Sequence, residues 1–416
     1  MSTSSLAVRL RRAERLVAEA GFVFMAFAAC PAIAGPVGFA SLNGGTTGGA
    51  GGPTVTATTG AEFKSYAEQE GPLVIRVEGA LDIGDVRVKS NKTISGIGAT
   101  GAVTGSLRLS GVSNVIVRNL SISNPGDFGE GDAVTIKESN NVWFDHNNIF
   151  DAPDGLLDIA RASDYVTVSW NKFYYTQPYA QSVNTNHRFA MLIGNSDSAT
   201  EDIGRLNVTL HNNHWGEFVR ERMPRVRYGD VHVFNNYFNS PGNNYAVRSA
   251  VGAELLIENN HFENIDDAWE KYQNSAGVGR IEAVGNLLEN SDADDPGSDN
   301  VFDPPYSYDA LAAEVVRSAV LAGAGIAELP GDYNADGLVD AADYTVWRDR
   351  FGAADGALPN DADGGPIGAA QRATWAAAYG ETLQARSASQ AVPEPASAAL
   401  LLCAAAALLR RSRTAR

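Results

Sequence analysis

From residue 110 onward, apolar and polar positions alternate in short runs, and each run closes on an asparagine followed within two residues by an aromatic residue or leucine. The runs read V-W-F-D-H-N-N-I-F, V-T-V-S-W-N-K-F, V-T-L-H-N-N-H-W, V-H-V-F-N-N-Y-F, L-L-I-E-N-N-H-F and I-E-A-V-G-N-L-L. A period of two places successive side chains on opposite faces of a strand, and the runs are rich in β-branched and aromatic residues. The pattern therefore predicts many short strands and excludes helical repeats.

The closing asparagine recurs at a nearly constant spacing. Its positions are 148, 171, 213, 236, 260 and 286, so the successive differences are 23, 42, 23, 24 and 26. A period in this range marks a stacked repeat, and the gap of 42 is two turns or one turn with a long loop. We predict an all-β solenoid, a parallel β-helix whose coils stack about 4.8 Å apart. Asparagine suits its turns because it tolerates left-handed backbone and can bond to its equivalents in neighbouring coils.

The ends of such a solenoid need caps. Residues 61–70, A-E-F-K-S-Y-A-E-Q-E, predict a short amphipathic helix that caps the N-terminal end. Residues 308–322 predict a second helix that packs near the other end.

Four arginines lie within eight residues of the stretch from Trp215 to Phe238: Arg220, Arg222, Arg225 and Arg227. Guanidinium groups this close repel one another unless an anion lies between them. The last two are two positions apart on a predicted strand, so they point to one face. The alternative is a solvated basic rim paired with Glu217 and Glu221. Because the chain carries a net charge of -17, the cluster is a local exception.

A set of carboxylates falls at the same place in the repeat. If Ile136 matches Ile159 one coil later, the offset of 23 places one aspartate opposite Gly155 and beside a second. A third lies four residues after the second, which predicts that these two share one strand face. The three are Asp132, Asp154 and Asp158. Any one of them is equally well a turn or loop residue. Together, without a basic partner in the same coil, they predict a site for a hard cation such as Ca²⁺.

The arginines share the angular position of these carboxylates. Counting back 14 residues from the coil-closing Phe173 reaches Ile159, and the same count from Phe238 reaches Pro224. A cation site beside a row of arginines would bind a polymer that bears carboxylates and lies along the solenoid. The expected ligand is therefore an acidic polysaccharide. Nucleic acid is excluded as a partner, because its binding rests on a basic surface.

The two ends of the chain carry targeting signals. Residues 1–34 combine early arginines, an apolar run and the small-residue sequence A-I-A, which predicts an export signal. Residues 392–416 begin with V-P-E-P, continue with an apolar run and end in a basic tail. This arrangement resembles the PEP C-terminal sorting tails of Gram-negative bacteria and implies a secreted or surface protein; a plain tail anchor is the alternative. The only two cysteines, Cys30 and Cys403, lie in these terminal segments, so the body holds no disulfide or thiolate metal site.

Ordered phrases across residues 36–326 resemble the pectate lyase superfamily, polysaccharide lyase family one. They are T-G-G-A-G-G-P-T-V at Thr47, V-K-S-N-K-T-I-S-G-I-G at Val88, N-V-W-F-D-H-N at Asn141, D-G-L-L-D-I at Asp154, M-L-I-G-N-S-D at Met191, and R-M-P-R-V-R-Y-G-D-V-H-V-F-N-N-Y-F at Arg222. The resemblance implies a right-handed parallel β-helix and Ca²⁺-assisted β-elimination of polygalacturonate. It also implies that Asp132, Asp154 and Asp158 bind the metal, Arg222 is the base, and Arg227 holds a substrate carboxylate.

One position departs from the family pattern. The family commonly has a lysine two residues before the methionine of M-L-I-G, where this chain has Phe189, preceded by Arg188. Matching Ile193 to Ile159 places Arg188 opposite Asp154. We therefore expect Arg188, with Arg225 and Arg227, to bind substrate.

Residues 329–382 predict a small helical module. Oxygen ligands recur with the spacing of an EF-hand-type loop, with glycine at its sixth position, at Asp332, Asn334, Asp336, Leu338, Asp340 and Asp343. The loop and the following helix resemble a dockerin type I repeat, and a second copy, in which 369–380 aligns with 341–352, lacks most ligands. The resemblance implies one Ca²⁺ and a cohesin-like partner; an acidic surface loop is the alternative. Residues 383–391 predict a linker, and 35–328 the β-helix domain.

Three other activities stay open on the same fold. A polygalacturonase-type hydrolase needs paired carboxylates that flank a glycosidic bond, whereas these carboxylates accompany arginines. A metal-free pectin lyase is expected to lack one or more of the three aspartates. A non-catalytic polysaccharide-binding surface β-helix would keep the asparagine repeat but not the convergence of aspartate and arginine.

Overall fold

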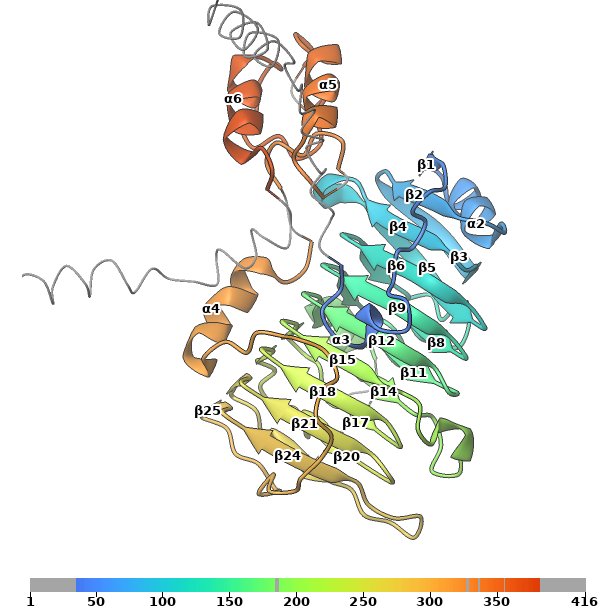
Figure 1. Cartoon of the computed structure of the whole chain (residues 1–416), viewed down its shortest axis with the longest axis vertical. Helices are drawn as coiled ribbons and strands as arrows, with labels where there is room; N and C mark the ends of the chain where they lie inside the picture. The colour runs from blue at the N-terminus through green and yellow to red at the C-terminus, as the bar shows by residue number, and fades with distance from the viewer. Residues whose placement is uncertain (1–34, 184–186, 327–328, 336, 355, 382–416) are drawn as a thin grey trace, which may run out of the picture. The chain divides into compact units, whose positions relative to one another are not determined.

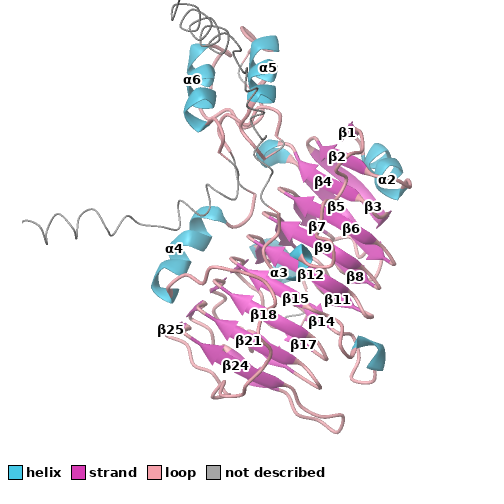
Figure 2. Ribbon diagram, viewed as in Figure 1, coloured by secondary structure: helices cyan, strands magenta, loops and turns pink. Residues whose placement is uncertain are grey.

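The protein is described by a computed structural model that covers residues 35–183, 187–326, 329–335, 337–354 and 356–381. Its body is a parallel β-helix in which successive turns of the chain stack on one another (Figures 1 and 2). The predicted fold class is therefore confirmed. The predicted export signal, linker and sorting tail lie outside the described residues.

One strand from each coil joins a ten-stranded parallel sheet. Its strands, in spatial order, are β1 (Thr54–Ala57), β2 (Leu73–Val77), β4 (Lys92–Gly96), β6 (Ser113–Arg118), β9 (Asn140–Asp145), β12 (Asp164–Ser169), β15 (Val208–His211), β18 (Asp230–Phe234), β21 (Glu254–Glu258) and β24 (Arg280–Val284).

The remaining strands form two further rows that the long strand β5 (Ala102–Ser110) joins, because its first half pairs with one row and its second half with the other. One row contains β3 (Ala80–Val88), β8 (Val134–Lys137), β11 (Leu157–Ala160), β14 (Leu192–Ile193), β17 (Arg225–Val226), β20 (Val247–Ser249) and β23 (Trp269–Lys271). The other contains β7 (Ser121–Ser123), β10 (Asn148–Phe150), β13 (Lys172–Tyr174), β16 (His214–Trp215), β19 (Tyr237–Phe238), β22 (His261–Glu263) and β25 (Leu287–Glu289).

Like residues stack on like residues inside the column. The aromatic rings of Phe173, Trp215, Phe238 and Phe262 are stacked, with centroids 4.5, 5.8 and 4.3 Å apart, and all four are fully buried. Each such ring removes a large apolar area from water and contributes dispersion contacts to both neighbouring coils. The aromatic residue that closes each sequence repeat is therefore a core residue.

A ladder of asparagines runs along the turn before these aromatics. The amide of Asn171 donates to the carbonyl oxygen of Asn213 at 3.1 Å, and that of Asn213 to Asn236 at 3.0 Å. The gap of 42 in the repeat is thus one coil with a long loop. In the first of these coils the ladder residue is Asn147, whose amide donates to Asn171 at 2.9 Å. The expected Asn148 instead begins β10.

Both capping helices form, with shifted boundaries. Helix α2 (Gly60–Glu68) begins with a capping box between Thr59 and Glu62 and packs on β1, β2 and β3. Helix α4 (Ala313–Gly323) starts five residues later than predicted and packs against β19 and β22. The preceding residues are extended because their backbone bonds to the coils: the carbonyl of Asp309 accepts from the amide of Asn235 at 3.0 Å. A short helix that was not predicted, α3 (Gln177–Ser182), lies in the long loop.

Two chain segments cover the ten-stranded sheet. Near the N-terminus, the amide of Phe39 donates to Thr209 and that of Ala40 to Thr167. From the other end, the hydroxyl of Tyr306 bonds to Thr209 at 2.7 Å, and its ring lies edge-on to Phe39 at 5.2 Å. This face of the solenoid is therefore closed by segments that flank the coils in the sequence.

The C-terminal module has two helices, α5 (Ala341–Asp349) and α6 (Ala369–Ala378), which start at the equivalent positions that the internal repeat predicts. Its core holds Tyr333, Trp347, Leu358 and Ile367. In the predicted loop, the buried Asp343 accepts the amides of Asn334 at 2.8 Å and Asp340 at 2.7 Å. Asp336 lies outside the described residues. None of the helices that the structure describes is long and apolar enough to cross a membrane.

Candidate active site

The row of strands that includes β8, β11, β14 and β17 carries the predicted site residues. Ile136, Ile159, Ile193 and Val226 pair in register and are fully buried, so the residues beside them point outward. This confirms the isoleucine register. The equivalent of Ile159 in β17 is Val226 rather than Pro224, so the count from the aromatics is wrong by two residues, because the spacing between the two strands of this coil differs.

The outward residues one position earlier form a line along the solenoid. Strand pairing places Arg108 beside Thr135, Thr135 beside Asp158, Leu192 beside Arg225, Arg225 beside Arg248, and Arg248 beside Glu270. Carboxylates and guanidinium groups therefore share one outer surface, as the repeat predicts.

The aspartates gather around Gly155. Asp132 is 5% exposed, and its two carboxylate oxygens accept the amide of Gly155 and the hydroxyl of Thr135, each at 2.9 Å. Asp158 accepts the amide of Leu192 at 2.9 Å. A methyl group on Gly155 would lie 2.4 Å from an oxygen of Asp158 and 3.0 Å from one of Asp132. Only glycine therefore lets the two carboxylates approach this turn.

The third aspartate, Asp154, differs from the other two. Its side chain is 51% exposed, and one carboxylate oxygen lies 3.9 Å from a guanidinium nitrogen of Arg222. It precedes β11 rather than sharing a strand face with Asp158, so the predicted common face is wrong. It joins the group because the turn at Gly155 brings it beside the strand.

Burial raises the pKa of Asp132 to about 6, with a further contribution from the negative charge of Asp154. Burial and the charge of Asp132 raise the pKa of Asp158 well above its ordinary value. A buried and a half-buried carboxylate that disfavour each other's charge are a fitting donor set for a hard divalent cation, which would compensate both charges.

Two groups in the described residues bring their ligand atoms within 4.8 Å of one another, which Asp132, Asp154 and Asp158 do not: His261 with Glu263 and Glu289, and Asp267 with Glu270 and Asp294. Each already contains a carboxylate with a cationic partner. Glu263 lies 3.2 Å from Arg317, and Glu270 pairs with Arg248. Asp154 likewise lies 3.9 Å from Arg222, but Asp132 and Asp158 form no ion pair with the described residues. The arginines nearby have buried nitrogens without a described partner.

Those arginines are four in number, and in each it is the Nε atom that is buried without a hydrogen-bond partner among the described residues: Arg188, Arg220, Arg222 and Arg225. Burial, followed by the charge of Arg220, lowers the pKa of Arg188. Burial, followed by the charge of Arg227, lowers that of Arg225. A buried guanidinium nitrogen without a partner is costly, so this cluster is suited to an anionic ligand.

Arg222 is held by an aromatic ring. Its guanidinium carbon lies 3.7 Å from the centre of the Phe189 ring, and 18% of its side chain is exposed. Its φ of +61° is uncommon for a residue with a side chain. This left-handed conformation turns the chain just before β17. Phe189, at the position where the family commonly has lysine, is 8% exposed and supports the guanidinium group of Arg222.

Arg227 makes a different set of contacts. Its guanidinium group pairs with Asp197 and donates to the carbonyl of Gly194 at 2.9 Å. The bond from Arg227 lowers the pKa of Asp197. Asp197 comes from the phrase M-L-I-G-N-S-D, so this pairing joins two of the sequence motifs.

The strand pairing also fixes the level of Arg188. Gly155 bridges Phe189, which bridges Glu221, so Arg188 stands at the level of Asp154, as the isoleucine register predicts. Its backbone carbonyl accepts the amide of Arg220 at 2.8 Å. The structure therefore brings Arg188, Asp154 and Arg222 to neighbouring coils.

The site extends beyond the predicted residues. Arg248 lies 3.5 Å over the ring of Tyr245, pairs with Glu270 and shares the ring of Tyr272 with Arg225, at 5.3 and 5.1 Å. Arg248 lies one repeat after Arg225 and pairs with it, so adding the repeat length to Arg225 would have predicted Arg248 as a site residue. The contact between Phe189 and Arg222 could not be predicted from the repeat in this way.

Comparison with known proteins agrees with this geometry. The pectate lyase family model matches residues 14–329. A pectate trisaccharide-lyase of Bacillus licheniformis is 36% identical over 315 residues, which cover 70% of this chain and 86% of that protein. Pectate lyase A of Emericella nidulans is 37% identical, over 69% of this chain and 85% of its own.

Among solved structures, a pectate lyase from Bacillus sp. N165 in complex with trigalacturonate matches with a TM-score of 0.61 and 33% identity. The match covers 70% of this chain and 99% of that one. The fold and the row of acidic and basic side chains thus define a polysaccharide lyase built on a parallel β-helix. The chain belongs to the pectate lyase family.

Proposed function

We propose that the protein cleaves unesterified polygalacturonate by Ca²⁺-assisted β-elimination and releases unsaturated oligogalacturonides. The observation that carries the proposal is that the buried Asp132 and the half-buried Asp158 lie on the same outer strand row as arginines whose Nε atoms have no described partner. A polyuronate supplies the anions that such arginines require. The relatives named above support the same substrate class.

Asp132, Asp154 and Asp158 would hold the Ca²⁺. When bound, the ion would withdraw electron density from the uronate carboxylate and so acidify the adjacent C5 proton. The three aspartates by themselves would repel a polyuronate. Their burial and mutual charge, which raise the pKa values of Asp132 and Asp158, make them receptive to a cation.

Arg222 is the proposed base. In its neutral form it takes the C5 proton, the electron pair left at C5 forms the C4–C5 double bond, and the C4–O bond breaks. The leaving oxygen then takes a proton from water. Guanidinium groups normally stay protonated, so the role requires neighbouring positive charge, which Arg225 in β17 and Arg188 in the preceding coil supply. Phe189 fixes the position of Arg222.

The other arginines bind the carboxylates of the substrate. Arg188 and Arg225 offer buried nitrogens without described partners, so they are the first candidates. Arg227 would contact substrate with those donors that Asp197 and Gly194 leave available, and its pairing fixes its direction. Charge-assisted bonds of this kind contribute about 1.5 to 3 kcal/mol each.

The proposal is tested with polygalacturonate and with highly methylated pectin, each with Ca²⁺ and with a chelator. Ultraviolet absorbance reports the unsaturated product. A methyl ester removes the negative charge that the cation and arginines would bind, so we expect turnover of methylated pectin to be lower by one to two orders of magnitude, since each lost contact costs about 1.5 to 3 kcal/mol.

Chelator should abolish cleavage of polygalacturonate. Chelator-insensitive cleavage of the methylated polymer would identify a pectin lyase instead. New reducing ends without absorbance would identify a hydrolase, and neither signal would identify a binding protein.

We also propose that residues 329–382 are a dockerin-like Ca²⁺ loop module that binds a cohesin-like partner, and that the protein is exported through residues 1–34 and the sorting tail. The repeated helices α5 and α6 and the buried Asp343 support the module. Deleting residues 329–416 should leave catalysis intact if the β-helix domain ends before Pro330. Pull-down with a cohesin domain, with and without Ca²⁺, tests the partner.

A further inference from the structure

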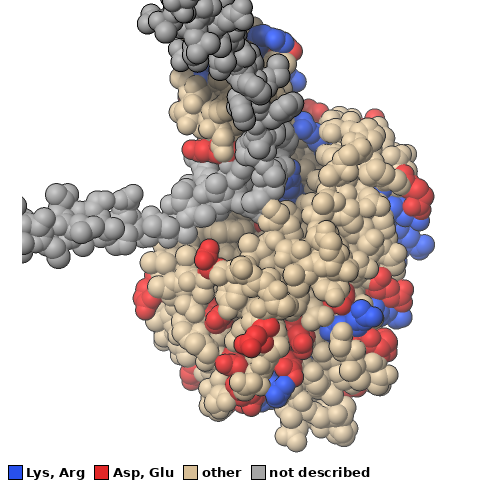
Figure 3. All heavy atoms as spheres, in the orientation of Figure 1, with Lys and Arg blue, Asp and Glu red and all other residues tan. Residues whose placement is uncertain are grey.

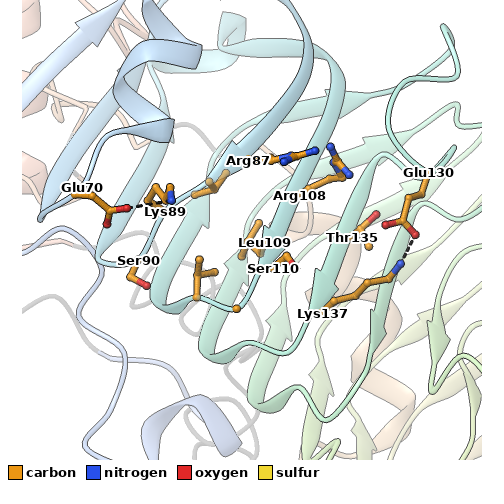
Figure 4. A pocket seen from close by; sticks show the side chains of 13 residues that line it. Glu70, Arg87, Lys89, Ser90, Arg108, Leu109, Ser110, Glu130, Thr135 and Lys137 are labelled. Carbon is orange, nitrogen blue, oxygen red and sulfur yellow. Dashed lines mark hydrogen bonds and ion pairs between the residues drawn. The ribbon is translucent and has the colours of Figure 1, made fainter. Parts of the chain in front are cut away.

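A second cationic surface lies on the coils that precede the aspartates. It is a cavity of about 430 Å³ formed by β3, β5 and β8 (Figure 4). Four cationic and two acidic side chains line it: Arg87, Lys89, Arg108, Lys137, Glu70 and Glu130. On the view in Figure 3, Lys and Arg atoms gather along the edge where β3 runs. In a chain of net charge -17, this is a local excess of positive charge.

Arg87 and Arg108 stand directly opposite each other on β3 and β5. Their side chains point to the same side, as Figure 4 shows. Arg108 is bound by Asp85, whose carboxylate accepts from its Nε at 2.6 Å. The guanidinium group of Arg87 is exposed and makes no hydrogen bond or ion pair with the described residues. Arg87 is therefore the member of this pair whose charge no described side chain compensates, so an anion bound there would compensate it.

The two lysines have replaceable partners. Lys89 pairs with Glu70 at 3.0 Å, and the Glu70 side chain is 80% exposed. Exposed ion pairs of this kind contribute about 0 to 1 kcal/mol, so a ligand carboxylate can take the place of Glu70. Lys137 pairs with Glu130 at the far side of the cavity.

The cavity adjoins the proposed active site. Thr135 lines it and also donates its hydroxyl to Asp132 at 2.9 Å. Strand pairing continues the line from Arg87 through Arg108 and Thr135 to Asp158. Three strand spacings separate Arg87 from Asp158, which is about 14 Å. A polymer that follows the strand row past the aspartates therefore reaches the cavity.

We propose that this cavity binds uronate carboxylates of the same polygalacturonate chain several sugar units away from the cleaved bond, with Arg87 and Lys89 as the principal contacts. The inference rests on the proposed function and extends it. It gives the enzyme a preference for long chains, because a short oligomer bound across the aspartates does not reach Arg87. Arg87 and Lys89 act in binding and take no part in the chemistry.

The test compares wild-type enzyme with the double variant Arg87→Gln/Lys89→Gln on long polygalacturonate and on trigalacturonate, at fixed ionic strength and saturating Ca²⁺. For the long polymer we expect KM to rise at least about tenfold with kcat unchanged, because two charge-assisted contacts are lost. For trigalacturonate we expect both constants to stay at wild-type values. The variant Arg205→Gln/Arg280→Gln is the control, since it removes the same charge from exposed residues at the ten-stranded sheet.

Each outcome has one meaning. Unchanged KM on the long polymer in an active double variant overturns the inference, and so does an equal rise in KM for both substrates or for the control. If the wild-type enzyme itself forms no unsaturated product, the proposed function fails first. Circular dichroism of both variants verifies that the β-helix persists.

Discussion

Two outer faces of this solenoid are built from the same repeat, but other segments of the chain cover one of them and leave the other open. On the ten-stranded sheet, flanking segments cover the strands, and their backbone amides and Tyr306 bond to Thr167, Thr209 and His232. On the row from β3 to β23, no described segment closes over Asp158, Arg222 and Arg225 in this way, and arginine nitrogens stay without described partners.

This difference indicates which face of a repeat protein can hold a binding or catalytic site. Buried polar groups usually have hydrogen-bond partners. The covered face follows this rule through contacts such as the 2.6 Å bond from Ser169 to Asp145, although Nε2 of His211 has no described partner. The open face departs from it at the residues that the proposed function uses. The same contrast separates Arg227, bound by Asp197, from Arg222, which among the described residues has a ring and a distant carboxylate beside it.

The largest expected effect comes from removing the proposed base on the open face. Arg222→Lys keeps the positive charge but changes the donor geometry, and Arg222→Ala removes both charge and base. We expect product formation to fall by about 10²- to 10⁴-fold in either variant, measured as ultraviolet absorbance. Arg205→Lys, on the covered side, serves as the control. Near-normal turnover in Arg222→Ala would remove this residue from the mechanism.

On the covered face, we expect low pH to decrease the stability of the fold through protonation of His211 in the unfolded chain. Burial lowers the pKa of His211 to about 4, from about 6.5 in the unfolded chain. The folded-state pKa is depressed, so this contribution to stability is full above pH 6.5 and is lost as the pH falls toward 4. The shift corresponds to about 3 kcal/mol. Chemical unfolding of wild type and His211→Phe from pH 7 to 4 measures it, and parallel curves would contradict the assignment.

On the open face the sign is reversed. The pKa of Asp132 is raised to about 6, so without metal its contribution to stability is full below pH 4 and is lost as the pH rises through 6. The shift corresponds to about 3 kcal/mol. In the presence of chelator, Asp132→Asn should therefore become more stable than wild type between pH 4 and 7. Added Ca²⁺ should reverse this order, and the absence of any Ca²⁺ effect on wild type would count against the metal site.

The smallest effects separate binding from positioning within the open face. Arg188→Ala should raise KM about tenfold by removing one charge-assisted contact. Phe189→Ala should instead lower kcat by about two- to thirtyfold, because a cation–π contact worth about 0.5 to 2 kcal/mol holds Arg222 in place. Steady-state kinetics on polygalacturonate distinguish the two. A larger rise in KM for Phe189→Ala would make the phenylalanine the substrate contact.

The sequence alone determined the solenoid, its register and the surface that carries the site. Each coil has the same local sequence pattern: strands with alternating apolar and polar residues, an asparagine turn and an inward aromatic residue. Because every coil folds in the same way, the local pattern is enough to predict the whole solenoid. Ile136, Ile159 and Ile193 align because burial tolerates no slip of a strand by one residue. The isoleucine register then places Asp158 and Arg188, whereas the count from the aromatic residues misplaces the arginine strand by two residues.

The tertiary structure decided the contacts that depend on loops between coils. Nothing in the repeat distinguishes Asn147 from Asn148 until the neighbouring Asn171 selects one of them. The ring of Phe189 reaches Arg222 from the irregular segment before β14, and Asp197 reaches Arg227 from the irregular segment after β14. Residues that are distant in the sequence meet there through the path of an irregular segment, which has no period from which the partners could be counted.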